Sequence, residues 1–503
     1  MPIPHLPNEL YTLIATYLCH HCQHPTDFPT ADSPTIRTYK STLYRLCLTS
    51  KRLLSIAQPI LYHYYATGNT PGPLNPSYPH HTCVDDKLPI FLESIINRSD
   101  LARQVRGLQL QEIWNTCPDP VLTGEQIRLF NLISEGARIT TPFPSHYTVN
   151  TAADLTHDKA SDNRVAVHKW LRMLALRVAS NTTMLLYGEN PKQPLTYIRQ
   201  HPQTLFSLTT LKFSSGAMGC CFGTLPALLY MAPNVTSLHI SDFMNYIGHT
   251  LPLSAPAGIP QLQKMPGIRT LVGEGIAMET FGTVVGWCEG LREVEFYYDG
   301  HFYGTQELVS ALTPVKGGLK KLVYMHISSR LPSYRGIDPP YKRTLGKSTV
   351  ETIESLHELE GLEELVIDQW AISSYEPRDG SRQRLITQLP PSIRSVHFRY
   401  VYKSMHVELQ LLAVAAGDRF PNLRKVRIDV VDDVNPEERE KLERMRQVEV
   451  SFGNVGVEVE WGVEASYNSS PTSETEISPT TVRGWRTAIS GRFSSLLSNY
   501  LPN

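Results

Sequence analysis

A six-residue pattern of apolar positions recurs along the chain from residue 205 onward. Each copy has an apolar residue, two variable residues, a second apolar residue, one variable residue and a third apolar residue. Full copies begin at Leu208, Val235, Leu291, Leu319, Leu362, Ile393 and Leu423, and a weaker copy begins at Ile268. Alternation with a period of two at the end of each copy indicates a short strand with one buried face. The pattern therefore predicts a series of similar short strands.

Helical patterns fill the intervals between these strands, and turn residues such as Gly290 precede most copies. The helices that we expect span 279–288, 306–312, 351–359 and 407–416. A unit of one strand and one helix cannot bury its own apolar face, so it must stack on its neighbours. The spacing resembles that of leucine-rich repeats, which recur every 20–29 residues or so, although many steps here are longer. An ordinary doubly wound α/β domain uses the same alternation and is the alternative.

The N-terminal part of the chain has helical rather than strand periodicity. Apolar residues recur at three-and-four spacing from Leu6 to Leu18, which makes one face of a helix apolar. Pro7 suits the first turn of that helix because its missing N–H needs no partner there. Ser50 is a favourable N-cap for a later helix. The sequence therefore predicts a small all-α unit over residues 1–65.

This helical unit resembles the F-box. The resemblance rests on the Leu6-Pro7 start before an acidic helix, on Ile14 and Leu18, and on the run 46–52; the exit 57–62 is similar to that of many fungal F-box proteins. F-box helices dock on a Skp-family adaptor, and through it on the cullin scaffold of a ubiquitin ligase. The adaptor-binding residues that the resemblance implies are Leu6, Pro7, Leu10, Ile14, Leu18, Leu46, Leu48 and Leu61.

One feature departs from the F-box pattern. A loop insert at 19–40, rich in His, Pro and Thr, separates the first helix from the second. Added length in an exposed loop costs little conformational entropy, so the fold tolerates the insert. The insert could still obstruct the face that meets the adaptor. It therefore bears on adaptor binding rather than on the fold.

The insert begins with Cys19-His20-His21-Cys22, which has the ligand types of a zinc site. Cysteine sulfur and histidine nitrogen both bind zinc, but a structural site needs four ligands. Only Cys47 or His5 lies near enough in sequence to add to the pair, and the ordinary interpretation is a helix end followed by a loop. We therefore expect no metal and no cofactor.

Composition places the chain among globular proteins. Of 503 residues, 41% are hydrophobic and 19% are charged, and the formal net charge is −1. This balance can bury a large core and gives no overall attraction for nucleic acid. No apolar run approaches the roughly 18–20 residues of a membrane span. The eight cysteines are scattered, as reduced thiols are. We expect a cytoplasmic or nuclear protein, or one found in both places, with no membrane span.

Residues between the apolar positions of each strand are expected to point to the concave surface of the solenoid. Both signs of charge occur there, and aromatic residues follow several strands at the loop rim. Mixed charge with aromatic anchors suits a protein partner. The target-binding residues that we expect are Glu293, Glu295, Tyr297, Glu364, Trp370, His397, Tyr400 and Arg427.

A search for catalytic motifs finds no phosphate-binding glycine loop followed by Lys-Ser/Thr. The run 214–219 contains Ser and Gly but lacks the Gly-x-Ser-x-Gly order of a nucleophile elbow. We therefore expect a protein that is not an enzyme and has no catalytic residues.

Composition shifts divide the chain. The helical unit at 1–65 is followed by a linker at 66–87 that is rich in Pro and Gly. The expected fold is α/β, with an irregular leucine-rich-repeat-like solenoid at 88–462 after the short all-α F-box. The tail at 463–503 is rich in Ser, Thr and Pro and carries an amphipathic pattern at 483–501, which caps the solenoid or binds a partner.

Together these features predict the substrate-recognition subunit of a Skp–cullin–F-box type ubiquitin ligase. The F-box would hold the adaptor, and the solenoid would hold a target protein that the sequence does not identify. The alternative is an interaction scaffold with the same solenoid, whose F-box does not engage a ligase.

Overall fold

The structure is a computed structural model. The structure describes residues 6–26, 28, 34–66, 87–110, 122–136, 157–189, 204–215, 224–242, 264–298, 305–326, 353, 355–372, 384–401, 405–431 and 445–464. Residues 67–86 of the expected linker and residues 465–503 of the expected tail, with the amphipathic pattern at 483–501, lie outside these ranges.

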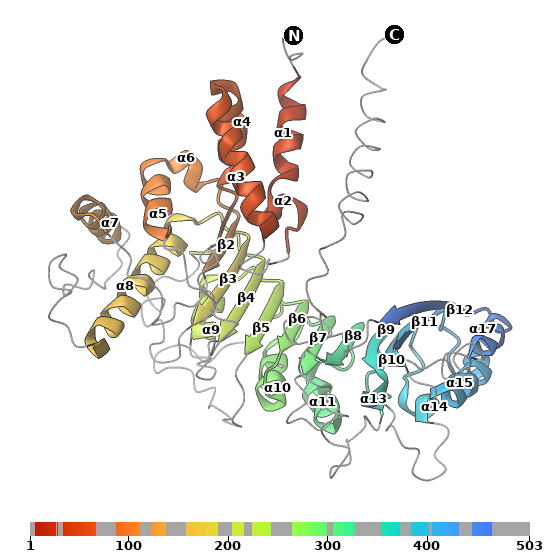
Figure 1. The fold of residues 1–503 in the computed structure, drawn as a ribbon. Helices are drawn as coiled ribbons and strands as arrows, with labels where there is room; N and C mark the ends of the chain where they lie inside the picture. Colours follow the sequence, from red (N-terminus) through yellow and green to blue (C-terminus); the bar gives the residue numbers. More distant parts are fainter. Residues whose placement is uncertain are drawn as a thin grey trace, which may run out of the picture.

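The described strands form one sheet of twelve parallel strands in which each strand pairs with the next one along the chain. Figure 1 shows them following one another from β2 to β12 along a curved sheet. The strands are β1 (Tyr64–Ala66), β2 (Gly107–Leu110), β3 (Met184–Glu189), β4 (Thr210–Ser215), β5 (Ser237–Asp242), β6 (Thr270–Glu274), β7 (Glu293–Tyr298), β8 (Lys321–His326), β9 (Glu364–Asp368), β10 (Ser395–Val401), β11 (Lys425–Val431) and β12 (Glu458–Glu464).

This strand order decides between the two folds that the sequence left open. A doubly wound α/β sheet reverses its strand order at a switch point, where the chain returns to the middle of the sheet. Here the spatial order equals the chain order from β1 to β12, without a reversal. The predicted apolar positions are in register, as in Leu271 beside Val294 and Val294 beside Leu322. The described part of the chain is therefore a mixed α/β solenoid.

The helices that follow the strands cover one face of this sheet. Apolar residues of these helices and of one strand face belong to a single continuous core, which includes Phe213, Phe281 and Phe296. The helices are α5 (Leu88–Asn97), α6 (Ser99–Ala102), α7 (Gly124–Gly136), α8 (His157–Val178), α9 (Thr224–Met231), α10 (Met278–Trp287), α11 (Thr305–Leu312), α13 (Gln369–Ile372), α14 (Arg384–Gln388), α15 (His406–Arg419) and α17 (Arg446–Gly453). A short 3-10 helix, η2, spans Thr313–Val315.

The helix expected at 351–359 is absent from the described residues of that range. Ile353, Leu356 and Leu359 are buried in the common core, but residues 355–359 form turns and irregular chain. The backbone N–H of Ile353 donates to the carbonyl of Ala371, and that of Leu356 donates to Gln388. These bonds to later residues replace the local hydrogen bonds of a helix. Apolar residues at every third position were therefore insufficient to specify a helix in this segment.

The N-terminal helical unit consists of α1 (Asn8–Tyr17), α2 (His20–Gln23), α3 (Pro34–Thr49) and α4 (Lys51–Leu61). It has its own small core, built around Ala15, Leu43 and Ile60. Ser50 caps α4 as expected, because its hydroxyl accepts the backbone N–H of Leu53 at 3.2 Å. Figure 1 shows α1 and α4 rising from one end of the sheet.

The segment 19–40 differs from the expected loop. It contains α2 and the beginning of α3, so helical structure occupies much of the insert. Phe28, which follows α2, packs against Tyr64 and Met184 on the sheet. The first strand of the sheet, β1, begins at Tyr64, within the residues expected for the helical unit. At the other end, β12 extends to Glu464, past the expected end of the solenoid at 462. The helical unit thus joins the solenoid directly through β1.

Replacement of Gly290 by alanine is expected to lower the free energy of unfolding by about 1–3 kcal/mol. A Cβ atom at this turn would lie 2.2 Å from the carbonyl oxygen of Pro266, in the turn before the preceding strand. Backbone cannot move aside as a flexible side chain can, so stacking of the two repeats would be disturbed. Urea unfolding of the purified protein measures the effect.

The matched control is Gly286→Ala in α10 of the same repeat. Nothing lies within 4 Å of a Cβ placed there. Alanine in an exposed helix interior stabilises by about 0.5–1 kcal/mol relative to glycine. A Gly290→Ala variant that unfolds at the same urea concentration as the control would contradict the close stacking of these turns.

Candidate protein-binding surfaces

The expected adaptor-binding residues of the helical unit occupy three kinds of position. Leu18, Leu46 and Leu61 pack against the core of the unit itself, so they hold the helices together. Pro7 lies exposed at the start of α1, and Leu48 is 69% exposed near the end of α3. These two side chains are therefore available to a partner.

The remaining expected residues, Leu6, Leu10 and Ile14, are half-buried along α1. The start of this helix is tied to α4, because the Arg52 guanidinium donates to the side-chain oxygen of Asn8 at 2.8 Å and to the carbonyl of Leu6 at 2.7 Å. These three residues of the expected set thus serve both the fold of the unit and its surface.

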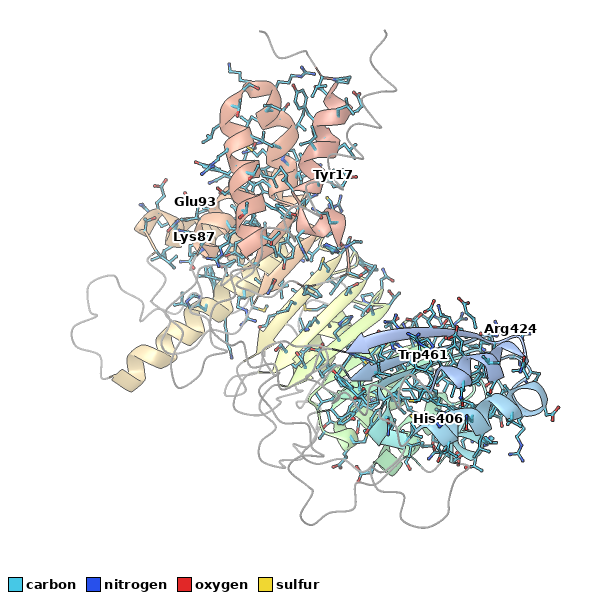
Figure 2. The ribbon with its side chains drawn as sticks, turned by 45° about the vertical axis from the view of Figure 1, so that its right-hand side comes forward. Tyr17, Lys87, Glu93, His406, Arg424 and Trp461 are labelled. Carbon is cyan, nitrogen blue, oxygen red and sulfur yellow. The ribbon has the colours of Figure 1, made fainter. Side chains whose placement is uncertain are left out.

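Four further apolar side chains of the unit are exposed and were absent from the expected set. Leu13 and Tyr17 are four residues apart on α1, so they share a helix face. Tyr44 shares a face of α3 with Leu48 of the expected set, which lies four residues later. Leu54 on α4 is also exposed. Figure 2 labels Tyr17 at the end of α1. The three-and-four spacing used above finds such residues but cannot tell a face toward the core from one toward solvent.

On the sheet, side chains between the apolar core positions face away from the helices, as expected. Glu293 and Glu364 are exposed on this second face, and Glu295 and His397 are half-buried there. The side chain of Arg427 is 48% exposed. Charges of both signs therefore lie on strands β7 to β11.

Two of the expected aromatic anchors are buried, unlike the charged residues on this face. Tyr297 and Tyr400 are each only 5% exposed, so the expectation that their rings project as surface anchors is wrong. Tyr297 packs with Val272, Val323 and Met325 in a small apolar cluster on the second face. Tyr400 lies within β10 rather than past its end. There the register with β11 shifts and the residue has a positive φ of 52°.

The third expected anchor, Trp370, is part of the short helix α13 (Gln369–Ile372) that directly follows β9. Its backbone therefore belongs to a helix and not to a rim loop. Its side chain lies outside the part of the chain that the structure describes in atomic detail.

A charge network connects β10 and β11 on the second face. The carboxylate of Asp429 is buried; it lies 2.7 Å from Nε2 of His397 and accepts from Nε of Arg427 at 3.0 Å. Burial alone would raise the pKa of Asp429, but the hydrogen bonds from His397 and Arg427 outweigh it and lower the pKa. Gly462 of β12 leaves room for this carboxylate, since a Cβ there would lie 2.0 Å from Asp429 Oδ1.

Replacement of Asp429 by asparagine is expected to lower the free energy of unfolding by about 1–3 kcal/mol near neutral pH, because His397 and Arg427 lose the buried charged acceptor that they share. The folded-state pKa lies below the ordinary value of 3.8, so the contribution is complete above about pH 4 and is lost as the pH falls through the lowered value. The gap between variant and wild type should therefore shrink in urea unfolding at pH 3.

Glu460→Gln is the matched control for Asp429→Asn. Glu460 accepts from Lys425 at 2.6 Å, but both side chains are about two-fifths exposed. Such a surface pair contributes about 0–1 kcal/mol. Equal losses in the two variants at pH 7 would contradict the role of the buried carboxylate.

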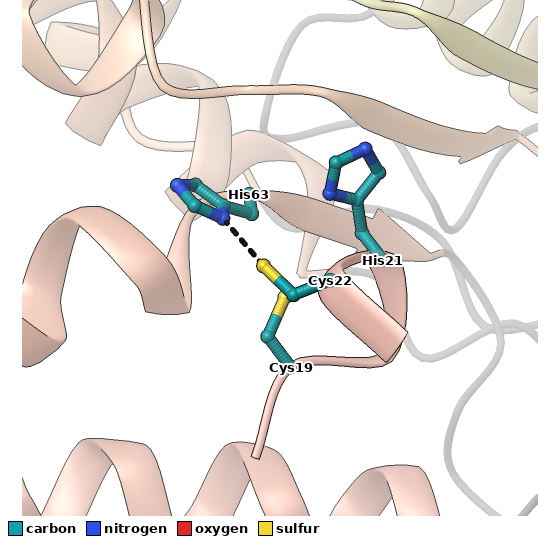
Figure 3. Close-up of side chains that lie close together, drawn as sticks. All are labelled: Cys19, His21, Cys22 and His63. Atoms are coloured by element: carbon teal, nitrogen blue, oxygen red, sulfur yellow. Dashed lines mark hydrogen bonds between the residues drawn. The ribbon is translucent and has the colours of Figure 1, made fainter. Parts of the chain in front are cut away.

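Four potential metal ligands meet where the helical unit joins the sheet. They are Cys19 before α2, His21 and Cys22 within α2, and His63 before β1 (Figure 3). One ligand atom of each residue lies within 4.8 Å of those of the other three. Sγ of Cys22 lies 3.3 Å from Nδ1 of His63. Of the two partners expected for the cysteine pair, Cys47 is not part of this group, and His5 lies outside the described residues.

The protonation of this cluster follows from its contacts. A hydrogen bond from Cys22 lowers the pKa of Cys19 to about 4 against the opposing effect of burial, with a further contribution from His63. The same bond and burial raise the pKa of Cys22. Burial lowers the pKa of His21, which favours the neutral imidazole. These shifts favour a thiolate at Cys19 and a neutral imidazole at His21.

Comparisons with known proteins find little similarity. No model of a protein family matches the sequence, and no curated protein matches it. A solved structure with some similarity is that of human 5T4, also called Wnt-activated inhibitory factor 1 or trophoblast glycoprotein. The match has 14% sequence identity and a TM-score of 0.23, and it covers 50% of this chain and 72% of that chain. The assignment of the fold therefore rests on the strand topology itself.

The described helices were also compared with the length and hydropathy of membrane spans. None of them is both long enough and apolar enough to cross a bilayer.

Proposed function

We propose that the protein is the substrate-recognition subunit of a Skp–cullin–F-box type ubiquitin ligase. The observation that carries the proposal is the helical unit of α1 to α4. It has its own core, joins one end of the solenoid and still exposes apolar side chains such as Leu13, Tyr44 and Leu48. Exposed apolar side chains on a small helical unit are typical of a surface that a partner covers.

The insert between the first and later helices leaves these side chains accessible. Its described part consists of α2, Phe28 and the beginning of α3, and Phe28 packs against Tyr64 and Met184 on the sheet. Tyr17, directly before this segment, is 59% exposed, and Leu48 on α3 is more exposed still. The described part of the insert therefore leaves Tyr17 on α1 and Leu48 on α3 accessible.

The second face of the sheet is the proposed surface for the target protein. Exposed Glu293, Glu364 and Arg427 place both signs of charge on the later strands. A mixed field favours a complementary protein segment over a polyanion such as nucleic acid. Because Tyr297 and Tyr400 are buried, recognition on this face relies on charged and polar side chains rather than on those two rings.

The test is a binding experiment with a purified Skp-family adaptor as bait and the full chain as prey. We expect a stoichiometric complex that survives size-exclusion chromatography. A folded chain that forms no complex would contradict the ligase role. That result, together with cross-linked cellular partners that map to β7 to β11, would support the interaction scaffold instead.

A further inference from the structure

The cysteines and histidines at the junction have the composition of a structural metal site. Thiolate sulfur and imidazole nitrogen are the ligands of closed, four-coordinate zinc sites. Tetrahedral zinc with bonds of about 2.0–2.3 Å separates its ligand atoms by about 3.3–3.8 Å. Cys22 and His63 are already at 3.3 Å, and all four ligand atoms lie within 4.8 Å. Small side-chain movements would complete the tetrahedron.

The surroundings of the four residues favour a metal over an ordinary packing role. Cys19 is buried, and Nδ1 of His21 is buried with no hydrogen-bond partner among the described residues. The rings of His21 and His63 lie edge to face, with centroids 6.0 Å apart and the cysteines beside them (Figure 3). A buried polar nitrogen without a partner is costly, and coordination would satisfy it.

Neighbouring residues of the same types are directed elsewhere. The ring of His20 lies near those of His24 and Tyr64, with centroids 5.2 and 5.6 Å away. Cys47 lies in the same small core as Cys19, but it is not part of the converging group of ligand atoms. Of the His- and Cys-rich segment at 19–24, only Cys19, His21 and Cys22 converge with the distant His63.

The position of His63 gives the site a structural consequence. His63 is 41 residues from Cys22, and its carbonyl accepts the backbone N–H groups of Arg106 and Gly107 at 2.9 and 2.8 Å. Its backbone is thereby bonded to the residues that begin β2. A metal held by His63 and by α2 joins the helical unit to the edge of the solenoid.

We propose that Cys19, His21, Cys22 and His63 bind one zinc ion that fixes the helical unit to the first strands of the sheet. The inference is independent of the ligase role, because it requires neither adaptor nor target. Soft sulfur ligands in a tetrahedral set select zinc over magnesium or calcium, which take oxygen ligands.

The experiment uses the full-length protein, stripped of metal with a chelator under reducing conditions and titrated with Co²⁺ as a spectroscopic probe. We expect one Co²⁺ per chain, with the absorption of a tetrahedral site and a thiolate-to-cobalt charge-transfer band, and displacement by one equivalent of Zn²⁺. Loss of an outer-shell partner costs about 10–100-fold in metal affinity, so His63→Ala, which removes a direct ligand, should cost at least about 100-fold.

Matched variants separate coordination from folding. Cys19→Ser/Cys22→Ser should abolish the charge-transfer band, whereas His20→Ala and Cys47→Ala should keep wild-type stoichiometry and spectrum. Far-UV circular dichroism confirms that each variant retains the solenoid. Failure of the reduced wild type to bind Co²⁺ would overturn the proposal. So would unchanged affinity after His63→Ala, or loss of binding in either control.

Discussion

Leu48→Glu is expected to abolish co-purification of the full chain with a Skp-family adaptor. Leu48 is 69% exposed on α3, so the charge should not disturb the core of the helical unit. In a desolvated interface the carboxylate would have no partner, and losses at such positions are about 2–4 kcal/mol or more, roughly 30-fold to 1,000-fold in affinity. Adaptor pull-down and titration calorimetry measure the loss.

The control for this substitution is Leu132→Glu. Leu132 is 65% exposed but lies on α7 (Gly124–Gly136), outside the helical unit. It should leave adaptor binding unchanged, which separates a local effect from a general effect of added charge. Wild-type affinity in the Leu48→Glu variant would exclude α3 from the adaptor surface and leave the F-box assignment without its main support.

A second test of the same surface is the double variant Leu6→Ala/Pro7→Ala. It should also abolish adaptor binding, but its interpretation needs a thermal unfolding curve. Pro7 is exposed, whereas Leu6 is half-buried and its carbonyl accepts from Arg52. A loss of binding in which the solenoid unfolds at an unchanged temperature supports direct contact.

Removal of zinc is expected to destabilise the joint between the helical unit and the sheet. A ligand that binds only the folded state, present at 1,000 times its dissociation constant, stabilises that state by about 4 kcal/mol. Most of this stabilisation should be lost in chelator, because His63 and α2 then have no common partner. Thermal unfolding with and without chelator, followed by circular dichroism, measures the change.

The Cys19→Ser/Cys22→Ser variant should behave like the chelated wild type and show no further response to chelator. Cys47→Ala should still respond, although loss of a buried side chain lowers its baseline stability. If the zinc-loaded wild type unfolded at the same temperature as the stripped protein, the ion would not stabilise this joint, whatever its affinity.

The repeating part of the fold was readable from the sequence because its signals are local. In β7, Val294 and Phe296 are buried while Glu293 is exposed, as the alternation of apolar and polar residues predicts. The same pattern, repeated in β9 to β11, predicted a series of similar strands, whereas their order in the sheet is given by the topology. Ser50 likewise caps α4 through its own side chain, so a local rule was sufficient.

Where the local signals were weaker, contacts with other repeats determined the conformation of the segment. The apolar spacing at 353–359 was compatible with a helix, but backbone bonds to Ala371 and Gln388 hold part of it in another conformation. Tyr400 follows a consensus strand core and was expected at a rim. An irregular register between β10 and β11 keeps it inside the strand and buried.

By itself the sequence determined the α/β repeat, the separate helical unit and the faces of most strands, because periodicity records which side of an element avoids water. Only the tertiary structure placed His63 beside Cys19 and Cys22, and Asp429 beside His397 and Gly462. These partners are distant in the chain or lie on different strands. Their proximity depends on the path of the chain between them, which no local pattern of residues specifies.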